Sequence, residues 1–400
     1  MKFFIDYSNT SISKYNTGIQ RTVKNIIEQT KYHRNNHEFI LIDLKNLNNS
    51  NNKNIKKKSL IKVPYFIIYS SIVILNKIGI WNFIHLTYFK MVCLKFFRKH
   101  EIKNSYYLNI DANWSDHNLY FMKKFQKYGG KVISVYYDNG PYMYPQFFYK
   151  DLVTNFTRHW YKAYNLSDLI LCISQTISDE FHTYVTNNSK RFNLRKIVPI
   201  DYFYLGNEPY SNIDNPLFNV TKKNNFKNYL VVGSIEPRKN NLMILKAFVR
   251  LFKDKNFKKN CKLIFIYNNS WMERNLINQI KSTIHYNKNI FLLDDINDRE
   301  LIYFYKTSYA LINASHYEGY GLSVGEALHH NLKVFCSKIK TFEEIYGNSV
   351  DYFDKNDPNS LVNLILSDLT KSKRKAKYKS FSWSDSFDMF LNKIFQNIIK

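Results

Sequence analysis

Two carboxylates eight residues apart are the residues of this chain whose type and spacing most clearly suggest chemistry. Glu318 and Glu326 enclose a short segment, Gly319, Tyr320, Gly321, Leu322 and Ser323. An apolar run at 310–314 precedes this segment and helix-forming residues follow it, which predicts a strand, a tight loop and the start of a helix. Such a loop directs backbone N–H groups and the positive end of a helix toward one point, and this suits a phosphate group.

The same residues also have purely structural interpretations. Ser323 and Glu326 have the spacing of a capping box, in which Glu326 would only close its own helix. Gly319 and Gly321 would then only permit a tight turn. The residues alone leave open whether Glu326 contacts a ligand or caps the helix that begins near Ser323.

A second candidate anion site follows an earlier apolar run. The run 230–232 ends at Gly233, and Ser234 and the adjacent cations Arg238 and Lys239 come next. Lys239 can act as a point charge and Arg238 as a planar fork for phosphate oxygens. A turn with two exposed cations also occurs in ordinary strand–helix connections, so this motif gains weight only beside the first one.

Short apolar runs alternate with helical patterns along the whole chain. Most runs are continuously apolar, as expected for parallel strands that are covered on both faces. The expected strands are 3–5, 39–42, 106–110, 132–136, 169–173, 229–232, 263–267, 290–293, 310–312 and 334–336. This alternation predicts doubly wound α/β sheets. Pro and Gly in a polar stretch at 206–227 predict a linker, and two α/β halves predict a cleft that holds the ligand.

A net charge of +26 suggests an anionic partner, namely nucleic acid, membrane or acidic small molecules, although background composition bias also accounts for part of it. Residues 45–103 are basic and rich in aromatic residues, and include the apolar run 65–75, which is too short to span a bilayer. They predict either a core helix with a basic edge or an element on the membrane surface. A second basic run, 371–377, is expected to be a solvated connector. No motif supports nucleic-acid binding.

The isolated cysteines predict buried thiols in a reducing compartment, and the N-terminus, which reaches Asp6 early, predicts a first strand rather than a signal peptide. A cytoplasmic protein is therefore expected. His316, His329 and His330 lack metal-binding spacing, so we expect no metal site.

Together, the two motifs resemble those of the retaining glycosyltransferases of family 4. The shared features are Glu318 and Glu326 around a Gly-x-Gly, and an earlier Gly-x-x-Glu-Pro-Arg-Lys-Asn segment at 233–240. Weaker pieces extend the resemblance over most of the chain, including the loop at Gly18, the loop at Asp138 and the segment 381–383, but not residues 45–103.

The resemblance implies the GT-B fold, in which two doubly wound Rossmann-like domains face a central cleft. The expected parts are an N-terminal acceptor-binding domain at 1–205, the linker at 206–227, a nucleotide-sugar-binding domain at 228–378, and a last helix at 379–400 that crosses back to the first domain. The basic segment 45–103 would be an insertion in the first domain that faces the membrane.

The resemblance also implies roles for individual residues. Glu318 would contact the donor sugar and Glu326 the ribose, while the backbone from Gly319 to Ser323 would bind the diphosphate. Lys239 would neutralise the leaving diphosphate in place of a metal. Arg238 would replace the arginine that many members carry where this chain has Ser234. Asp138 is the nearest polar candidate because Tyr137 stands where many members have histidine. Ser234 and Gly18 complete the expected donor site.

By resemblance, the chain would move a hexose from a nucleotide-diphosphate sugar to a glycan acceptor, without a metal or cofactor. GDP-mannose is the first candidate donor, since the Glu-Pro-Arg-Lys-Asn variant is typical of mannosyltransferases of surface-polysaccharide assembly such as that of O-antigen. The acceptor would be carried by a lipid at the inner face of the cytoplasmic membrane, where the enzyme would be peripheral. The alternatives are an inactive GT-B binding or scaffold protein, a basic nucleic-acid-binding protein and a GT-B phosphorylase.

Overall fold

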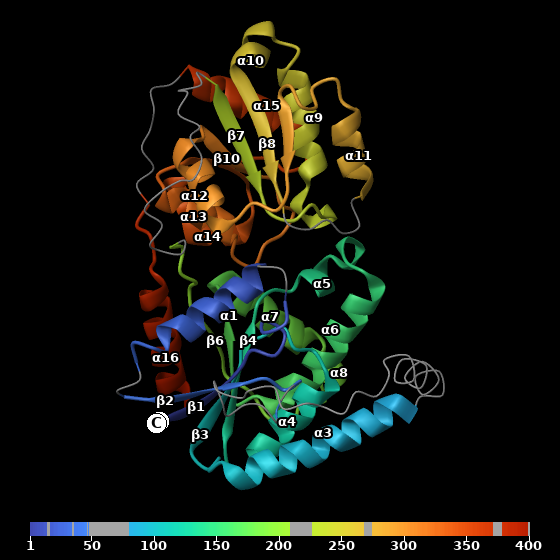
Figure 1. Ribbon diagram of the computed structural model, residues 1–400, viewed down its shortest axis with the longest axis vertical. Helices are drawn as coiled ribbons and strands as arrows, with labels where there is room; N and C mark the ends of the chain where they lie inside the picture. The colour runs from blue at the N-terminus through green and yellow to red at the C-terminus, as the bar shows by residue number, and fades with distance from the viewer. Residues whose placement is uncertain are drawn as a thin grey trace, which may run out of the picture. The chain divides into compact units, whose positions relative to one another are not determined.

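The computed structural model describes residues 1–13, 17–33, 36–45, 47, 80–208, 226–267, 274–370 and 378–398 (Figure 1). Three sequence predictions fall wholly or mostly outside these residues. They are the apolar run 65–75, the basic run 371–377 and the linker at 206–227.

The first half of the chain builds a six-stranded sheet in the order β2-β1-β3-β4-β5-β6. Its strands are β1 (Lys2–Asp6), β2 (Glu38–Ile42), β3 (Ser105–Asn109), β4 (Lys131–Tyr136), β5 (Leu169–Cys172) and β6 (Ile200–Tyr202). The pairs β1–β2, β1–β3 and β3–β4 are parallel. Buried aromatic rings fix helices to this sheet, because Phe4 of β1 packs edge-on against Phe96 and Phe125.

Those two rings belong to α3 (Ile80–Lys99) and α4 (Asp116–Lys127). The other helices and turns of this half are α1 (Gly18–Gln29), α5 (Gly140–Met143), η2 (Pro145–Phe147), α6 (Lys150–Ala163), η3 (Tyr164–Leu166), α7 (Gln175–Asn187) and α8 (Ser189–Phe192). The last helix, α16 (Trp383–Ile398), packs on β6, where Lys393 donates a 2.8 Å hydrogen bond to Asp201.

The second sheet has the order β12-β11-β10-β7-β8-β9, and each of its pairs is parallel. Its strands are β7 (Lys227–Val232), β8 (Cys261–Ile266), β9 (Ile290–Leu293), β10 (Ala310–Asn313), β11 (Lys333–Ser337) and β12 (Asp351–Phe353). In chain order this is the 3-2-1-4-5-6 arrangement of a Rossmann sheet. Its switch point, where the strand order reverses, lies between β7 and β10.

Helices cover both faces of the second sheet (Figure 1). One buried core joins the sheet to α9 (Asn241–Leu251), α10 (Lys255–Asn260), α11 (Arg274–Ser282) and α15 (Pro358–Leu369). A second core joins the opposite face to α12 (Asp298–Thr307), α13 (Leu322–His329) and α14 (Lys340–Tyr346). Two short turns, η4 (Pro237–Lys239) and η5 (Gly347–Ser349), complete this half.

Contacts between α-carbons divide the chain into two compact units. The first unit contains Met1–Val135, Arg158–Ile170 and Ser189–Pro199, and the second contains Tyr136–Thr157, Leu171–Asn188 and Ile200–Lys400. The predicted domain boundaries at 205, 228 and 378 stay predictions.

The α/β class with two doubly wound parallel sheets is confirmed. All ten predicted strands form, with ends that differ by at most two residues. The strands β6 and β12 were not predicted, because each is a three-residue edge strand with a polar residue that interrupts any apolar run. The four cysteines are buried and unbridged, as predicted. Among the described residues, no helix combines the length and apolarity needed to cross a membrane.

Candidate active site

The two motifs meet at the switch point of the second sheet. β7 leads into the Gly233–Lys239 loop and β10 leads into the Ala314–Gly321 loop. The two strands are neighbours, with Ala310 paired to Tyr229, so both loops leave the same carboxyl edge of the sheet side by side. Open α/β sheets bind their ligands at this position.

Glu318 lies in the middle of a buried ion cluster. Its Oε1 accepts hydrogen bonds from Lys239 Nζ at 2.5 Å and from the Ser315 hydroxyl at 2.7 Å, and its Oε2 accepts one from Arg238 at 2.8 Å. Burial would raise the pKa of the Glu318 carboxyl, but Lys239 and Arg238 outweigh it and lower that pKa to about 2. Glu318 is therefore a carboxylate at every physiological pH.

Arg238 is held in place by a second buried carboxylate. Its guanidinium donates to Glu236 at 2.6 Å as well as to Glu318, and to the Tyr317 carbonyl at 2.9 Å. Glu236 also precedes Pro237 at the start of η4, where no side-chain cap forms. Glu236 therefore positions Arg238, a role that the sequence prediction did not assign to it.

The backbone of the Ser315–Gly321 loop is fixed from outside. Each of its seven consecutive carbonyl oxygens accepts a hydrogen bond from a side chain. In chain order the donors are Ser337, Lys355, Arg238, Thr341, Ser174 and, for the last two carbonyls, Tyr346. Side-chain hydrogen bonds to its backbone carbonyls therefore hold the loop rigidly.

The backbone N–H groups of the same stretch remain open. Within the residues that the structure describes, the amides from Tyr317 to Ser323 donate to no protein acceptor. Buried amides without partners are costly unless a ligand or water accepts from them. The loop therefore presents a row of donors at the start of α13, which is the arrangement that binds phosphate groups.

Two glycines are needed to shape this loop. A β-carbon at Gly319 would lie 2.3 Å from the Tyr137 carbonyl oxygen, so only glycine fits. Gly321 has φ +87° and is the N-cap of α13. The capping-box interpretation of Ser323 and Glu326 is therefore wrong, because the N-cap of the helix is Gly321, two residues before Ser323, and no side-chain cap forms.

Glu326 is directed by a tyrosine instead. It is 5 % exposed on α13, and its Oε2 accepts a 3.0 Å hydrogen bond from the Tyr305 hydroxyl of α12. This contact fixes the orientation of the carboxylate without neutralising it. Glu326 can therefore still accept hydrogen bonds from vicinal hydroxyls such as those of a ribose.

Asp138 joins this site from the loop after β4, within the second unit. Its β-carbon would lie 3.1 Å from a β-carbon at Gly319, and Gly140 donates to its carboxylate at 2.8 Å. Burial raises the pKa of Asp138, an effect that Arg238 only partly offsets. Tyr317 links the same loop to α7, because its hydroxyl accepts from the Asn139 amide at 3.0 Å and donates to Glu180 at 2.8 Å.

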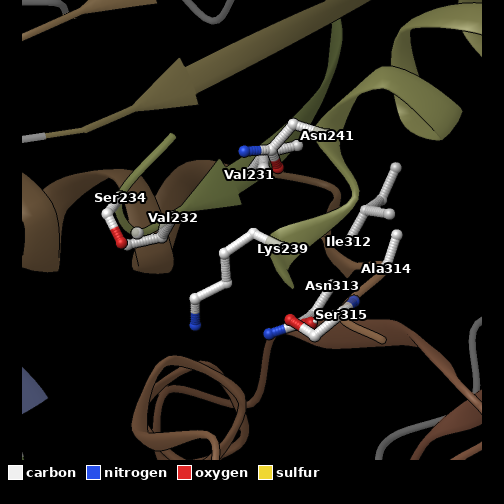
Figure 2. A pocket seen from close by; sticks show the side chains of 10 residues that line it. Val231, Val232, Ser234, Lys239, Asn241, Ile312, Asn313, Ala314 and Ser315 are labelled. Carbon is white, nitrogen blue, oxygen red and sulfur yellow. Dashed lines mark hydrogen bonds between the residues drawn. The ribbon is translucent and has the colours of Figure 1, made fainter. Parts of the chain in front are cut away.

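A pocket opens where the two loops face each other. Figure 2 shows the Lys239 side chain extending through it past Ser234. The other lining residues are Val231, Val232, Gly233, Asn241 and the stretch 312–315. The empty space, which includes open solvent at its mouth, is about 230 Å³.

The structure brings together most of the predicted site residues. Arg238, Lys239 and Glu318 contact one another, Asp138 abuts Gly319, and Ser234 lines the pocket with Lys239. Gly18 lies in the first unit, where it is exposed and begins α1. Among the described residues, no group of three or more His, Cys, Asp or Glu side chains is placed to hold a metal ion.

Residues 213–382 match the family described as glycosyl transferases group 1. This part of the chain is similar to that family. Its matched residues include both site loops and the whole second sheet. The predicted resemblance to glycosyltransferases is therefore confirmed for this part of the chain.

Curated relatives of this chain include mannosyltransferases. It is 25% identical over 239 residues to the serotype-specific mannosyltransferase WbdA of Escherichia coli, covering 57% of this chain and 29% of that protein. It is 27% identical over 171 residues to the O-antigen chain mannosyltransferase B of Escherichia coli, covering 41% and 44%. The chain thus spans less than a third of the first relative's length.

Solved structures share the fold along the length of this chain. A trehalose-6-phosphate protein from E. coli, bound with UDP-2-fluoro glucose, has a TM-score of 0.62 at 12% identity and covers 100% of this chain and 96% of its own. Sucrose-phosphate synthase from Thermosynechococcus elongatus has a TM-score of 0.59 at 12% identity and covers 99% and 94%.

Several residues at the site were missed from the sequence. Glu236, Ser315, Tyr317 and Glu180 all contact predicted site residues or one another. Glu236 lies two residues before Arg238, and Ser315 lies three residues before Glu318. This closeness in the chain could have identified both as site residues. Glu180 lies on α7, 137 residues before Tyr317, and no local pattern connects them.

Proposed function

We propose that this chain is a retaining glycosyltransferase that moves a hexose from a nucleotide-diphosphate sugar to a glycan acceptor. The observation that carries the proposal is the loop from Ser315 to Gly321. Side chains hold all of its carbonyls, while the amides from Tyr317 to Ser323 remain open. A fixed row of N–H donors beside Lys239 is suited to a diphosphate.

Charge at the site supports departure of a diphosphate. Lys239 and Arg238 are 17% and 15% exposed in their side chains and are balanced by Glu318 before any ligand arrives. In the proposed reaction the bond between the anomeric carbon and the diphosphate oxygen breaks, and the diphosphate leaves with the electron pair. The two cations stabilise the charge that develops on it, as a metal does in other enzymes.

The acceptor then reacts on the same face of the sugar. Its hydroxyl oxygen bonds to the anomeric carbon, and its proton passes to the departing diphosphate oxygen. No covalent bond to the protein forms in this scheme. Glu318 stabilises the positive charge that develops on the sugar ring, and its low pKa keeps it ionised for that purpose.

Mannose is the hexose that we propose, with GDP-mannose as donor and a surface polysaccharide as product. The relatives named above are mannosyltransferases, one of them of the O-antigen chain. We assign Glu326 to the ribose, because it is a buried carboxylate one helical turn beyond the phosphate-binding amides. The proposal includes neither a metal nor an organic cofactor.

We further propose that the protein binds the inner face of the cytoplasmic membrane through α3. The outer side of α3 exposes Tyr88 and Met91, each 53%, and Leu94, 38%, three residues apart. Exposed cations accompany them, namely Lys95, Arg98 and Lys99, and α3 contains no acidic residue. Apolar side chains among cations suit anionic lipid.

Vesicle sedimentation tests this surface. Wild-type protein is expected to bind vesicles that contain phosphatidylglycerol, and to release them at high salt, while the paired change Met91→Glu and Leu94→Glu abolishes binding. Ile284→Glu changes a residue that is 76% exposed elsewhere and serves as the control. Equal binding by the α3 variant and wild type would exclude the surface.

The activity is tested by thermal shift with GDP-mannose, UDP-glucose, dTDP-glucose and ADP-glucose, followed by a transfer assay with the donor that binds. A shift with GDP-mannose alone, and release of GDP on turnover, is expected. Binding without turnover on any acceptor would favour the alternative, an inactive binding protein. Salt-sensitive binding to duplex DNA without any nucleotide-sugar shift would refute the proposal.

A further inference from the structure

Four aromatic rings form a continuous surface next to the site. Tyr144 and Phe147 stack with centroids 5.8 Å apart, and Phe147 stacks on His316 at 5.1 Å with an interplanar angle of 16°. Tyr144 also lies 5.3 Å from the ring of Tyr317. We call these four rings the aromatic platform. They come from η2 and from the loop after β10, and all belong to the second unit.

The platform is partly exposed, unlike the aromatic cores of the two sheets. Tyr144, Phe147 and His316 are half-buried, whereas Tyr317 is buried beneath them. Burial and the nearby Lys355 lower the pKa of His316, so its ring is neutral at physiological pH. The three half-buried rings are neutral and nearly parallel, and they leave aromatic surface within reach of solvent.

Two carboxylates lie near the platform. The Tyr317 hydroxyl bonds to Glu180, and Asp138 lies against Gly319, two residues beyond Tyr317. The platform is also fixed to the ion cluster, because the His316 amide donates to the Arg238 carbonyl at 2.8 Å. Partly exposed aromatic rings with carboxylate acceptors nearby suit a pyranose ring, which has apolar C–H faces and hydroxyl donors around its rim.

We propose that the aromatic platform is the acceptor subsite, and that it binds a neutral pyranose residue of the acceptor glycan by stacking. This inference rests on the proposed glycosyltransferase function. An acceptor must bring a hydroxyl beside the donor sugar, and the platform meets that need because His316 and Tyr317 directly precede Glu318. The chemical class of ligand is a neutral glycan, recognised through its C–H faces and its hydroxyls.

The order of residues along the loop favours an acceptor sugar over the donor's base. Glu326 is assigned to the ribose, the open amides between Glu326 and Glu318 to the diphosphate, and Glu318 to the donor sugar. His316 and Tyr317 of the platform come directly before Glu318 in the chain, whereas the diphosphate amides come after it. The platform is therefore next to the donor sugar rather than next to the nucleotide. A base that stacked there would have to cross the diphosphate site.

The platform is tested with Phe147→Ala, which removes the central ring, and with Phe147→Trp, which keeps a flat ring. Phe226→Ala is the matched control, since Phe226 is 38% exposed and precedes β7 at the opposite, amino edge of the sheet. We expect Phe147→Ala to raise the acceptor KM about tenfold, with Phe147→Trp close to wild type. Donor affinity and slow hydrolysis of the donor by water should not change.

Two results would overturn the subsite. One is an unchanged acceptor KM in Phe147→Ala, and the other is a weakened donor affinity, which would assign the platform to the nucleotide base. Thermal unfolding of each variant, together with Phe147→Leu, which keeps apolar volume but not a ring, separates loss of stacking from loss of folding. Recovery of wild-type KM by Phe147→Leu would also refute stacking.

A binding assay separates this inference from the proposed function. Wild type and Phe147→Ala are titrated with mannose, glucose, galactose and N-acetylglucosamine disaccharides by NMR. Wild-type binding that is lost in Phe147→Ala supports the subsite even in a protein without turnover, and such a protein would contradict only the glycosyltransferase proposal. Turnover in wild type with equal disaccharide binding in both proteins would contradict only the subsite.

Discussion

The ammonium of Lys239 lies 2.5 Å from the carboxylate of Glu318, although the two residues are 79 positions apart in the chain. Both belong to loops at the switch point of one Rossmann sheet. In the free protein Glu318 therefore serves as the internal counterion of a cation that we assign to the diphosphate. A bound diphosphate competes with Glu318 for Lys239, and this competition can be measured.

Glu318→Gln should separate binding from chemistry. Transfer is expected to fall by about 10²–10³-fold, because the charge that stabilises the sugar cation is lost. Affinity for GDP should stay the same or increase, because Lys239 loses its competing carboxylate. Steady-state rates and calorimetric titration with GDP measure the two effects. Transfer at the wild-type rate would remove Glu318 from the mechanism.

Lys239→Ala should weaken binding of the nucleotide diphosphate about tenfold or more, because a charge-assisted contact is lost. The loss of affinity caused by Lys239→Ala should be smaller for the nucleoside, which has no phosphates, than for the nucleotide diphosphate. Lys262→Ala is the control, since that ammonium lies over the ring of Phe226 at the opposite edge of the sheet. Equal losses in both variants would indicate a general electrostatic effect rather than a diphosphate contact.

Glu326→Gln should reduce discrimination between a ribose donor and its 2′-deoxy analogue. The wild-type carboxylate is oriented by Tyr305 and can accept from both ribose hydroxyls, whereas an amide offers a single acceptor oxygen. Competition assays with GDP and 2′-deoxy-GDP measure the ratio. An unchanged ratio, with only a lower melting temperature, would assign Glu326 to structure alone.

Gly319→Ala should destabilise the protein by about 1–3 kcal/mol, since its β-carbon would overlap a backbone carbonyl that cannot rotate away. Gly347→Ala measures the cost of backbone strain alone, because its φ of +47° disfavours alanine although no atom lies within 4 Å of the added β-carbon. Urea unfolding of the two variants measures the steric and backbone costs separately. A Gly319→Ala protein as stable as wild type would mean that the loop moves freely away from Tyr137.

The depressed pKa of Glu318 predicts a pH-dependent stability. Its folded pKa of about 2 lies below the ordinary value of 4.5, so its stabilising effect is complete above pH 4.5 and is lost as pH falls toward 2. The difference between the two pKa values corresponds to about 3 kcal/mol of folding free energy. Urea unfolding at pH 7, 5, 4 and 3 should show the gap between wild type and Glu318→Gln narrowing only at acid pH. A gap that widens on acidification would contradict this assignment.

Much of the fold could be predicted because its strands are continuous apolar runs. The loops that follow β7 and β10 were both recognised from charge and glycine. Their meeting at one edge of the sheet follows from the strand order of the structure, in which β7 and β10 are neighbours. The short edge strands β6 and β12 lack such runs, since Asp201 and Asp351 lie within them.

Other parts of the site depend on conformation that the sequence does not display. The capping-box alternative is excluded because Gly321, in the left-handed conformation, caps α13 two residues before Ser323. The contact of Tyr317 with Glu180 joins a strand-end loop to a distant helix. Only three-dimensional packing stacks Phe147 on His316, because the two residues lie far apart in the chain.

The seven side-chain hydrogen bonds that hold the carbonyls of the Ser315–Gly321 loop have a consequence for how this protein can diversify. Because six different side chains anchor the carbonyls, any change of loop path must break several unrelated contacts at once. Substitutions that change the choice of substrate are therefore expected at positions next to the loop. Directed evolution toward a new donor or acceptor should accumulate substitutions around the loop, while the backbone conformation of the loop itself stays the same.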